Sequence, residues 1–453
     1  MKTDFFIFSH FLILQRGFII FVKYHFNKKN MHHRNQLLTI LAILPLLALN
    51  LNAQNCLDMV KTDKGVASGV YHPYHPGNTE DTPAPKGYEP FYISHYGRHG
   101  SRYHTTVKYF SAGTKGLEKA QEMGILTDEG KQLYADFNTV LKEHTDMEGE
   151  LTPRGAREHR EIAERMYRRF PEVFNNRDRR EIDSKASTVP RCLISMANFT
   201  TSLKDSKPSL QFTFDTGQRY LNYIAQNIPC DSLFKDCNHF EDSLRATCGH
   251  EKLMATVFTD VEKGMKAVGN PQKFAKSIYF AGVICPDLDF LGVDIFKYFD
   301  SEELTQQWLC RSDKMYGQFG NSREWGDISS AAAKDLVKDI VEKADNALKE
   351  SSHRAADLRF GHDTGILPLY GLIRIKGMDE QYPMANGHDH WNTYDMIPMG
   401  SNFQMIFYRN RKGDVLVKLL ANEEETVIPS LPTEYGPYYK WSDLRNYLVS
   451  LTE

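Results

Sequence analysis

Three strand-like runs of this chain each end in polar residues that stand just before the start of a helix. The three junctions are Phe91-Tyr92-Ile93 before Arg98-His99-Gly100-Ser101-Arg102, residues 182–186 before Arg191, and Leu358-Arg359-Phe360 before His362-Asp363. In open α/β sheets, ligands bind beyond the carboxyl ends of the strands, where helix N-termini add partial positive charge. The pattern therefore predicts an α/β fold, with a mostly parallel sheet flanked by helices and these polar groups at one edge.

Helix and turn signals agree with this architecture. Thr152-Pro153 has the pattern of a helix N-cap and first turn, Pro190 opens a second helix, and residues 366–372 form a third helical run. Residues 403–408 and 415–420 flank Lys412-Gly413 and predict an antiparallel hairpin.

The region from 215 to 352 differs from the rest because it is mostly helical. It ends in a strongly periodic helix with an apolar face that includes Leu336, Ile340 and Ala344. We therefore predict three parts: an upstream extension and signal peptide over 1–53, an α/β core from 54–214 and 353–453, and an inserted, mainly helical cap domain over 215–352.

The charge distribution argues against a nucleic-acid binder. Residues 1–53 hold six Lys or Arg and one acidic residue, so the remaining 49 basic and 57 acidic residues leave about eight negative charges. After Cys56 no run is long and apolar enough to cross a bilayer. We expect neither nucleic acid as a partner nor a stable membrane span in the mature chain.

A short apolar run near the start has the pattern of a secretory signal peptide. Residues 37–49 follow the basic segment 31–34 and precede the small residue Ala53. We expect a signal peptide at about 31–53, with Met31 as the true start and a secreted or periplasmic protein that begins at Gln54. A membrane segment within 1–30 and a lipid anchor on Cys56 are the alternatives.

Seven cysteines would enter an oxidising compartment if the signal peptide is real, and five of them lie between 230 and 310. Disulfides are expected there, at least one thiol stays unpaired, and the pairing cannot be read from the sequence. A zinc site is less well supported, because no Cys-x-x-Cys pair occurs among the clustered cysteines and histidines Cys230, Cys237, His239, Cys248 and His250. Disulfides and buried thiols account for these residues better. We interpret His388-Asp389-His390 as a loop.

The polar residues at the three junctions have the functional groups that phosphate-ester hydrolysis requires. A neutral imidazole can attack phosphorus in line, and guanidinium groups match phosphate oxygens and stabilise their charge. A protonated carboxyl can donate to the departing alkoxide. Gly100 would let the backbone approach the anion.

These motifs resemble those of the histidine acid phosphatases, the secreted branch of the histidine phosphatase superfamily, which includes phytases and multiple inositol-polyphosphate phosphatases. The resemblance covers most of residues 88–425. It is carried by the Arg98–Arg102 signature, the Leu151–Gly155 helix start (LTPRG), Arg191 in a Thr188-x-x-Arg191 setting, the Gly361–Thr364 run (GHDT), and Leu419–Glu423 (LLANE).

The resemblance implies a role for each residue. It implies a phosphohistidine on His99, Asp363 as the acid that protonates the leaving group, no metal or other cofactor, and phosphate held by Arg98, Arg102, Arg191 and His362.

Three departures bear on the substrate. His104 stands where many members have Pro, and Gly365 where many phytases have Asn. The inositol-polyphosphate group often carries His-Ala-Glu in place of His362-Asp363. His104 and Thr105 are candidate substrate contacts.

Each of these residues also has a simpler interpretation. The arginines could be exposed surface residues, His99 and His362 could be buried core histidines, and Asp363 could cap a helix that begins at Thr364. We therefore predict a secreted phosphomonoesterase that acts on small phosphate esters, with inositol polyphosphates such as phytate as the first substrate guess. The alternatives are a broad-specificity acid phosphatase, a non-catalytic protein that binds phosphorylated ligands, and a phosphomutase.

Overall fold

The computed structural model describes residues 10–15, 18–23, 56–77 and 80–453. They belong to two compact units, one within residues 1–54 and the other within 55–453. In the first unit, β1 (His10–Gln15) pairs with β2 (Phe18–Lys23) as antiparallel strands. The whole predicted signal peptide, about 31–53, lies outside the described residues. Among the helices of the described part, none has the length and apolar character that spanning a bilayer requires.

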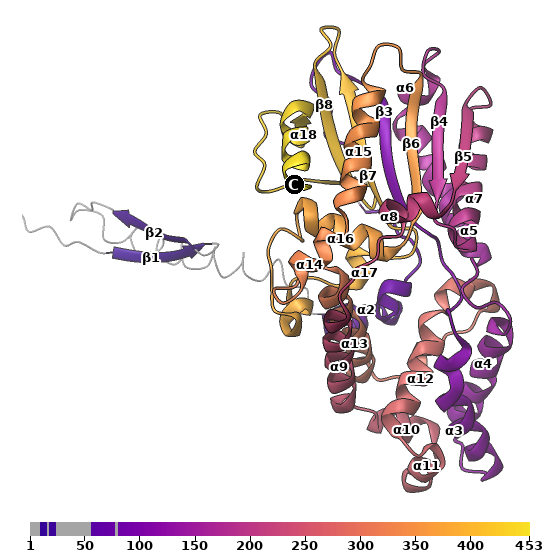
Figure 1. The fold of residues 1–453 in the computed structure, drawn as a ribbon. Helices are drawn as coiled ribbons and strands as arrows, with labels where there is room; N and C mark the ends of the chain where they lie inside the picture. Colours follow the sequence, from indigo (N-terminus) through magenta and orange to yellow (C-terminus); the bar gives the residue numbers. More distant parts are fainter. Residues whose placement is uncertain (1–9, 16–17, 24–55, 78–79) are drawn as a thin grey trace, which may run out of the picture. The chain divides into compact units, whose positions relative to one another are not determined.

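An eight-stranded sheet organises the second unit (Figure 1). Its order is β10 (Tyr438–Lys440), β8 (Val415–Ala421), β7 (Asn402–Arg409), β3 (Glu89–Arg98), β6 (Arg354–Gly361), β4 (Glu181–Ala186) and β5 (Gln211–Thr216), and β9 (Glu424–Thr426) pairs with β8. The four neighbouring strands β3, β6, β4 and β5 are parallel. The pairs that involve β7, β8, β9 and β10 are antiparallel. The α/β class is confirmed, but the sheet is mixed, because its C-terminal strands pair antiparallel. The connections between β7, β8 and β9 are short, and only antiparallel strands can be joined so tightly.

Helices cover both faces of the sheet and enclose two hydrophobic layers. One layer contains Ile93 and Ile406 with apolar residues of α5 (Pro153–Arg169), α6 (Pro171–Asn175) and α7 (Pro190–Ser206). The other contains Tyr92 and Phe407 with residues of α15 (Lys334–Ala347), α16 (Asp363–Ile373) and α18 (Trp441–Ser450). Neighbouring strand residues enter opposite layers because successive side chains of a strand point to opposite faces.

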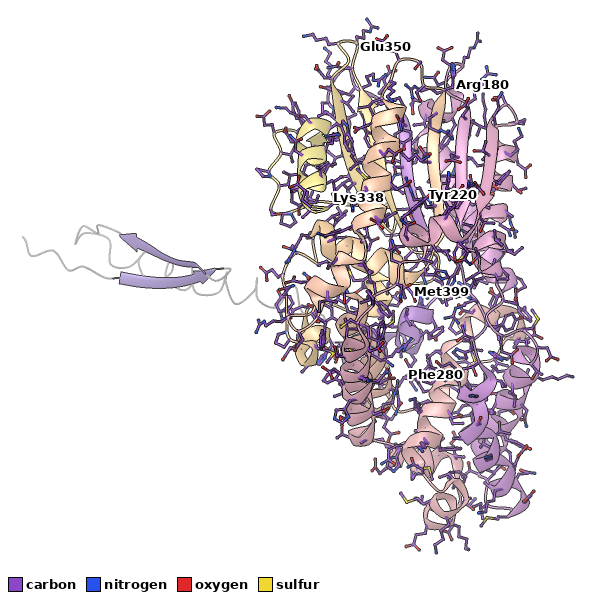
Figure 2. All side chains as sticks on the ribbon, viewed as in Figure 1. Arg180, Tyr220, Phe280, Lys338, Glu350 and Met399 are labelled. Atoms are coloured by element: carbon purple, nitrogen blue, oxygen red, sulfur yellow. The ribbon has the colours of Figure 1, made fainter. Side chains whose placement is uncertain are left out.

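The remaining helices gather beyond the carboxyl ends of β3, β4, β5 and β6 (Figure 1). The α-helices there are α2 (Cys56–Thr62), α3 (Ser111–Glu122), α4 (Asp128–His144), α9 (Asp231–Thr247), α10 (Glu251–Val257), α11 (Val261–Val268), α12 (Pro271–Val283), α13 (Ser301–Phe319), α14 (Gly326–Ala331) and α17 (Thr393–Met396). Short 3-10 turns include η1 (Lys64–Tyr71), η4 (Pro286–Leu291) and η6 (Met384–Asp389). Figure 2 shows Phe280 of α12 in this region, Met399 near its border with the sheet, and Arg180 at the far end of the sheet.

The helical region does not coincide with the predicted insertion over 215–352. β5 extends to Thr216, and α15 packs against β3, β6 and α16 beside the sheet. In turn, α3 and α4 precede the predicted insertion, yet they pack against α10, α11 and α12. Periodicity identifies a helix, but it does not say which distant helix will cover its apolar face.

The local predictions that position the site are confirmed. Thr152 caps α5, with its hydroxyl accepting a hydrogen bond from the backbone N–H of Gly155 at 3.2 Å. β3, β4 and β6 include the three predicted strands, and β7 and β8 form the predicted hairpin. Because β3, β4 and β6 are parallel, their carboxyl ends bring the three polar junctions to one edge of the sheet.

Candidate active site

The segment after β3 is anchored on both sides by backbone hydrogen bonds. The N–H of Arg98 donates to the carbonyl of Ser401 at 2.8 Å, and the N–H of His99 donates to that of Gly361 at 3.0 Å. The carbonyl of His99 accepts from the N–H of Gly400 at 3.0 Å. His99 is therefore held between the ends of β6 and β7, both neighbours of β3.

Gly100 is required for a close approach between its backbone and the first turn of α5. A Cβ atom at Gly100 would lie 2.5 Å from the carbonyl oxygen of Gly155, and one at Gly155 would lie 2.3 Å from that of Ser101. These two glycines let the first turn of α5 pack directly on the loop that carries His99. The expectation that Gly100 lets the backbone approach an anion stays a prediction.

Glu158 of α5 holds the loop that follows His99 by hydrogen bonds to Ser101. Its carboxylate accepts from the Ser101 N–H at 2.8 Å and from the Ser101 hydroxyl at 2.7 Å, and it also accepts from the Tyr74 N–H at 2.9 Å. We did not single out Glu158, although the sequence held a signal: it lies on the apolar face of α5, with His159 and Ile162. A charged residue on a buried helix face needs partners, and here they are the groups of the loop.

The geometry of His99 leaves one ring nitrogen free for chemistry. Its Nδ1 lies 2.9 Å from the carbonyl oxygen of Gly100, which can only accept, so Nδ1 carries the proton and Nε2 has the lone pair. Burial and the positive charges of Arg191 and Arg98 hold the pKa of His99 well below its usual value. The imidazole is therefore neutral, as an attacking nucleophile must be.

Three guanidinium groups surround His99, and each has a hydrogen-bond donor without a partner. Arg98 is fully buried and donates from Nη1 to the carbonyls of Val70 (2.7 Å) and Ile397 (2.8 Å). Arg102 donates to its neighbour's carbonyl at 2.8 Å, and Arg191 donates to that of Gly149 at 3.4 Å. The Nε groups of all three arginines are buried and have no hydrogen-bond partner. Crowded cations with unpaired donors form a site that favours an anion.

His362 and Asp363 come to the same place from the end of β6. The rings of His99 and His362 are 5.6 Å apart between centroids, and Nε2 of His362 lies 3.0 Å from the hydroxyl of Ser187. Burial and the charge of Arg191 lower the pKa of His362 to about 4. His362 is the N-cap residue of α16, where the helix dipole adds to the attraction for an anion.

Asp363 is an ion-pair partner as well as the first residue of α16. Its carboxylate lies 3.1 Å from Nη2 of Arg98 and accepts from the N–H of Thr364 at 2.9 Å. Burial raises the pKa of Asp363, but Arg98 and Arg102 outweigh burial and hold it at about 2. The carboxyl is thus ionised in the free protein, so a proton on Asp363 requires an incoming negative charge to offset the arginines.

The two predicted substrate contacts have different surroundings. His104 is fully buried, its Nε2 lies 2.7 Å from the carbonyl of Phe280, and its ring packs against Tyr71 and Tyr109. That packing contradicts the prediction that His104 contacts substrate, because an imidazole shielded on all sides supports the wall of the site instead. Thr105 is exposed, and a Cβ atom at Gly149 would lie 3.8 Å from its methyl group and 3.5 Å from Nη1 of Arg191. Thr105 stays a candidate contact at the rim.

Arg311 of α13 is a functional candidate that sequence reasoning missed. Burial lowers the pKa of its guanidinium, whereas Tyr71 and Asp363 are among the groups that raise it. Arg311 is also among the charges that lower the pKa of His104, so it acts electrostatically on the loop that carries His99 and His104. Its Nε is buried without a hydrogen-bond partner, and the side chain as a whole is partly exposed. Nothing in the local sequence distinguishes Arg311 from a surface arginine.

Cys192 was also not assigned to the site. Its Sγ contacts the carbonyl of Gly361 at 3.2 Å and Nε2 of His362 at 3.7 Å. Burial raises the pKa of Cys192 to about 12, so the group is a thiol that packs against His362 and does not act as a nucleophile.

The segment around His388 and His390, which we predicted to be a loop, forms the 3-10 turn η6 with His390 as its C-cap residue. Nδ1 of His388 contacts the carboxylate of Asp313 at 2.8 Å, and the ring of His390 stacks on Tyr382 with 3.6 Å between centroids. Among the described residues, no group of three or more His, Cys, Asp or Glu side chains has the arrangement of a metal site.

A neutral buried imidazole, three arginines and a carboxyl at the ends of parallel strands are the groups that a phosphoryl-transfer enzyme with a histidine nucleophile would require, which points to that class of enzyme. Comparison with known proteins agrees with this class. Residues 97–422 match the family model of the histidine phosphatase superfamily (branch 2). The chain belongs to this superfamily and is a phosphatase.

Individual relatives support the same assignment. Human multiple inositol polyphosphate phosphatase 1 is 23% identical over 412 residues, which is 79% of this chain and 78% of the human protein. The multiple inositol polyphosphate phosphatase of Bifidobacterium longum, solved with inositol hexasulfate, has a TM-score of 0.70 at 18% identity over 84% of this chain and 97% of its own. The phytase of D. castellii has a TM-score of 0.63 at 15% identity over 85% of both chains. The two structural matches show a common fold.

Proposed function

We propose that this protein is a secreted phosphomonoesterase that hydrolyses inositol polyphosphates, such as phytate, through a phosphohistidine on His99. The observation that carries the proposal is the set of unpaired buried donors on Arg98, Arg102 and Arg191 around a neutral imidazole. A phosphoryl group placed among these donors would have its oxygens held while Nε2 of His99 faces phosphorus.

The reaction then has two steps. Nε2 of His99 forms a bond to phosphorus as the ester bond breaks, and the leaving oxygen takes a proton from Asp363. Water next attacks the phosphohistidine, loses its proton to Asp363, and releases phosphate and a neutral His99. Bound phosphate makes the proton on Asp363 possible because its negative charge offsets Arg98 and Arg102, which keep the carboxyl ionised in the free protein.

Excess positive charge near the site supports a substrate with several phosphates. Arg311 acts on the pKa of His104, and none of the described acidic residues forms an ion pair with it within 4.0 Å. The charge of Glu241 raises the pKa of Arg311, but that carboxylate pairs with Arg245 and Lys314. One phosphoryl group occupies the donors around His99, so a further cation favours a second phosphate on the same molecule. The relatives named for inositol polyphosphate phosphatase activity support the same substrate class.

Arg311 gives the test of the substrate class. Replacing Arg311 with alanine should raise KM about tenfold for inositol hexakisphosphate and less than about twofold for a small aryl phosphate, because one charged hydrogen bond is worth about 1.5 kcal/mol or more. Phosphate release would be measured for both substrates in the presence of EDTA, where full activity is expected. Arg323→Ala, which removes an exposed arginine after α13, is the matched control. Equal effects on both substrates, or no release from inositol hexakisphosphate, would favour a broad-specificity phosphatase.

The proton balance predicts the pH dependence. In the free protein Asp363 is ionised above pH about 2 and His362 is neutral above pH about 4. The proton that Asp363 gives to the leaving group must therefore arrive with the substrate, as the monoanion of the phosphate ester. This monoanion loses its proton with a pKa of about 6. For an alkyl phosphate, kcat/KM should be nearly constant from pH about 4 to 6 and fall about tenfold per pH unit above 6. Initial rates between pH 3 and 9 would test this. A decline that begins between pH 2 and 4 would contradict it.

Secretion rests on the signal-peptide pattern alone. The basic segment 31–34, the apolar run 37–49 and Ala53 support export. N-terminal sequencing of the exported protein should find Gln54 first, and a mature chain that retains residues 31–53 would refute the proposal.

A further inference from the structure

Two of the seven cysteines lie next to each other in the helical region. Cys248 is the C-cap residue of α9, Cys310 lies within α13, and their Sγ atoms are 3.4 Å apart. Both side chains are buried, with exposures of 6% for Cys248 and 2% for Cys310. The two residues are 62 positions apart in the sequence, so only the packing of α9 against α13 brings them together.

The other five cysteines have different neighbours. Four of them contact oxygen atoms. The Sγ atoms of Cys56, Cys192 and Cys285 contact the backbone carbonyls of His388, Gly361 and Ala281, respectively, and Sγ of Cys230 contacts the hydroxyl of Ser232. Cys237 is buried against Met384 and Leu233. Cys248 and Cys310 therefore form the one sulfur–sulfur contact among the seven cysteines.

We propose that Cys248 and Cys310 are a modification site, at which a disulfide bond ties the end of α9 to α13. The Sγ atoms are already in van der Waals contact, and a bond of about 2.0 Å requires only a small further approach. This inference is independent of the phosphatase reaction, because neither cysteine touches the residues around His99.

The chemistry is a thiol–disulfide exchange with an external disulfide as the oxidant. The hydrogen bond from Cys310 lowers the pKa of Cys248 against its burial, and the guanidinium of Arg245 adds to the effect. The Cys248 thiolate attacks the oxidant's disulfide, forms a mixed disulfide and releases one thiol. Cys310 then loses its proton and displaces the second thiol. The two cysteines are oxidised by two electrons, and the oxidant is reduced to two thiols.

The bond would stabilise the helical region on which the site rests. It closes a loop that contains α10, α11 and α12, the helices that pack against α3 and α4. A loop of about 60 residues restricts the unfolded chain substantially. α13 also carries Arg311, next to Cys310, so the bond would fix the helix that supplies this cation.

Peptide mapping decides the pairing directly. The full chain would be equilibrated in an oxidising glutathione buffer, unfolded in the presence of N-ethylmaleimide, digested without reductant and analysed by mass spectrometry. We expect one cross-linked peptide pair containing Cys248 and Cys310, with the maleimide on the other five cysteines. Maleimide on both Cys248 and Cys310, or either of them bonded to a different cysteine, would overturn the proposal.

Thermal stability gives a second measurement. Reductant should lower the Tm of the oxidised protein by about 3 to 5 °C, as expected for one large-loop disulfide in a chain of this length. Cys248→Ser and Cys310→Ser should each abolish this response to reductant. Cys237→Ser, at a buried cysteine of the same region that has no cysteine partner, should retain it. A response that survives in Cys248→Ser, or is absent from the wild type, would contradict a bond between the two residues.

Discussion

Replacing His99 with alanine should lower kcat by about 10⁴-fold or more for aryl and inositol phosphates alike, because a missing nucleophile affects every substrate. The structure supports this size of effect because the contact of Nδ1 with the carbonyl of Gly100 leaves the lone pair on Nε2 of His99 free to attack. Initial rates under saturating substrate would measure the loss. Rapid acid-free quenching of the wild type with labelled substrate should trap a phosphoenzyme that is absent from His99→Ala.

The control for this variant is His353→Ala. His353 is exposed next to the N-terminal end of β6, whereas the site lies at the other end of that strand. It should retain activity within about twofold, as surface substitutions usually have small effects. Turnover by His99→Ala at more than about a tenth of the wild-type rate would refute the proposed intermediate. Wild-type protein that binds inositol polyphosphate without releasing phosphate would instead favour the non-catalytic interpretation.

Replacing Asp363 with asparagine should lower kcat by about 10² to 10⁴-fold for inositol and alkyl phosphates, which is the usual contribution of a general acid. An aryl phosphate whose leaving group needs no proton should lose much less in the first step. The ratio of the two losses is the informative quantity, because removal of the 3.1 Å ion pair with Arg98 will affect both substrates through phosphate binding. Rates for a series of leaving groups would separate the two effects.

A matched comparison for Asp363→Asn is Asp339→Asn. Asp339 pairs with the buried Arg359 at 2.6 Å beside the sheet, so this variant also leaves a buried arginine without its carboxylate partner. It should lower stability without changing the dependence of kcat on the leaving group. If Asp363→Asn shows the same loss for good and poor leaving groups, Asp363 is not the proton donor.

The candidate site was predictable from the sequence because its residues follow local signals. Arg98, Arg191 and His362 each stand where a strand gives way to a helix, and strand and helix-start patterns are short-range features. His104 shows the limit of such reasoning. It is two residues from Arg102, yet its ring is enclosed by Tyr71, Tyr109 and the carbonyl of Phe280, which come from distant segments.

The extent of the helical region illustrates the same limit. Residues 251–283 lie in the region predicted to be helical, whereas no helix was predicted over 111–144. The contact between these two segments depends on amphipathic faces that meet in space. Conversely, we assigned α15 to the end of the predicted insertion because it continues the helical run from 215 to 352, whereas its apolar face covers the sheet. Burial of an apolar face is a tertiary property, and any complementary surface can satisfy it.

The sequence by itself determined the α/β class, the superfamily motifs and the proposed reacting groups His99 and Asp363, because these depend on residue type and near-neighbour spacing. Only the tertiary structure decided the charge state of Asp363, the free nitrogen of His99, the place of Arg311 and the contact between Cys248 and Cys310. The physical reason is that pKa values, unpaired donors and sulfur–sulfur contacts are set by groups that the chain brings together from far apart.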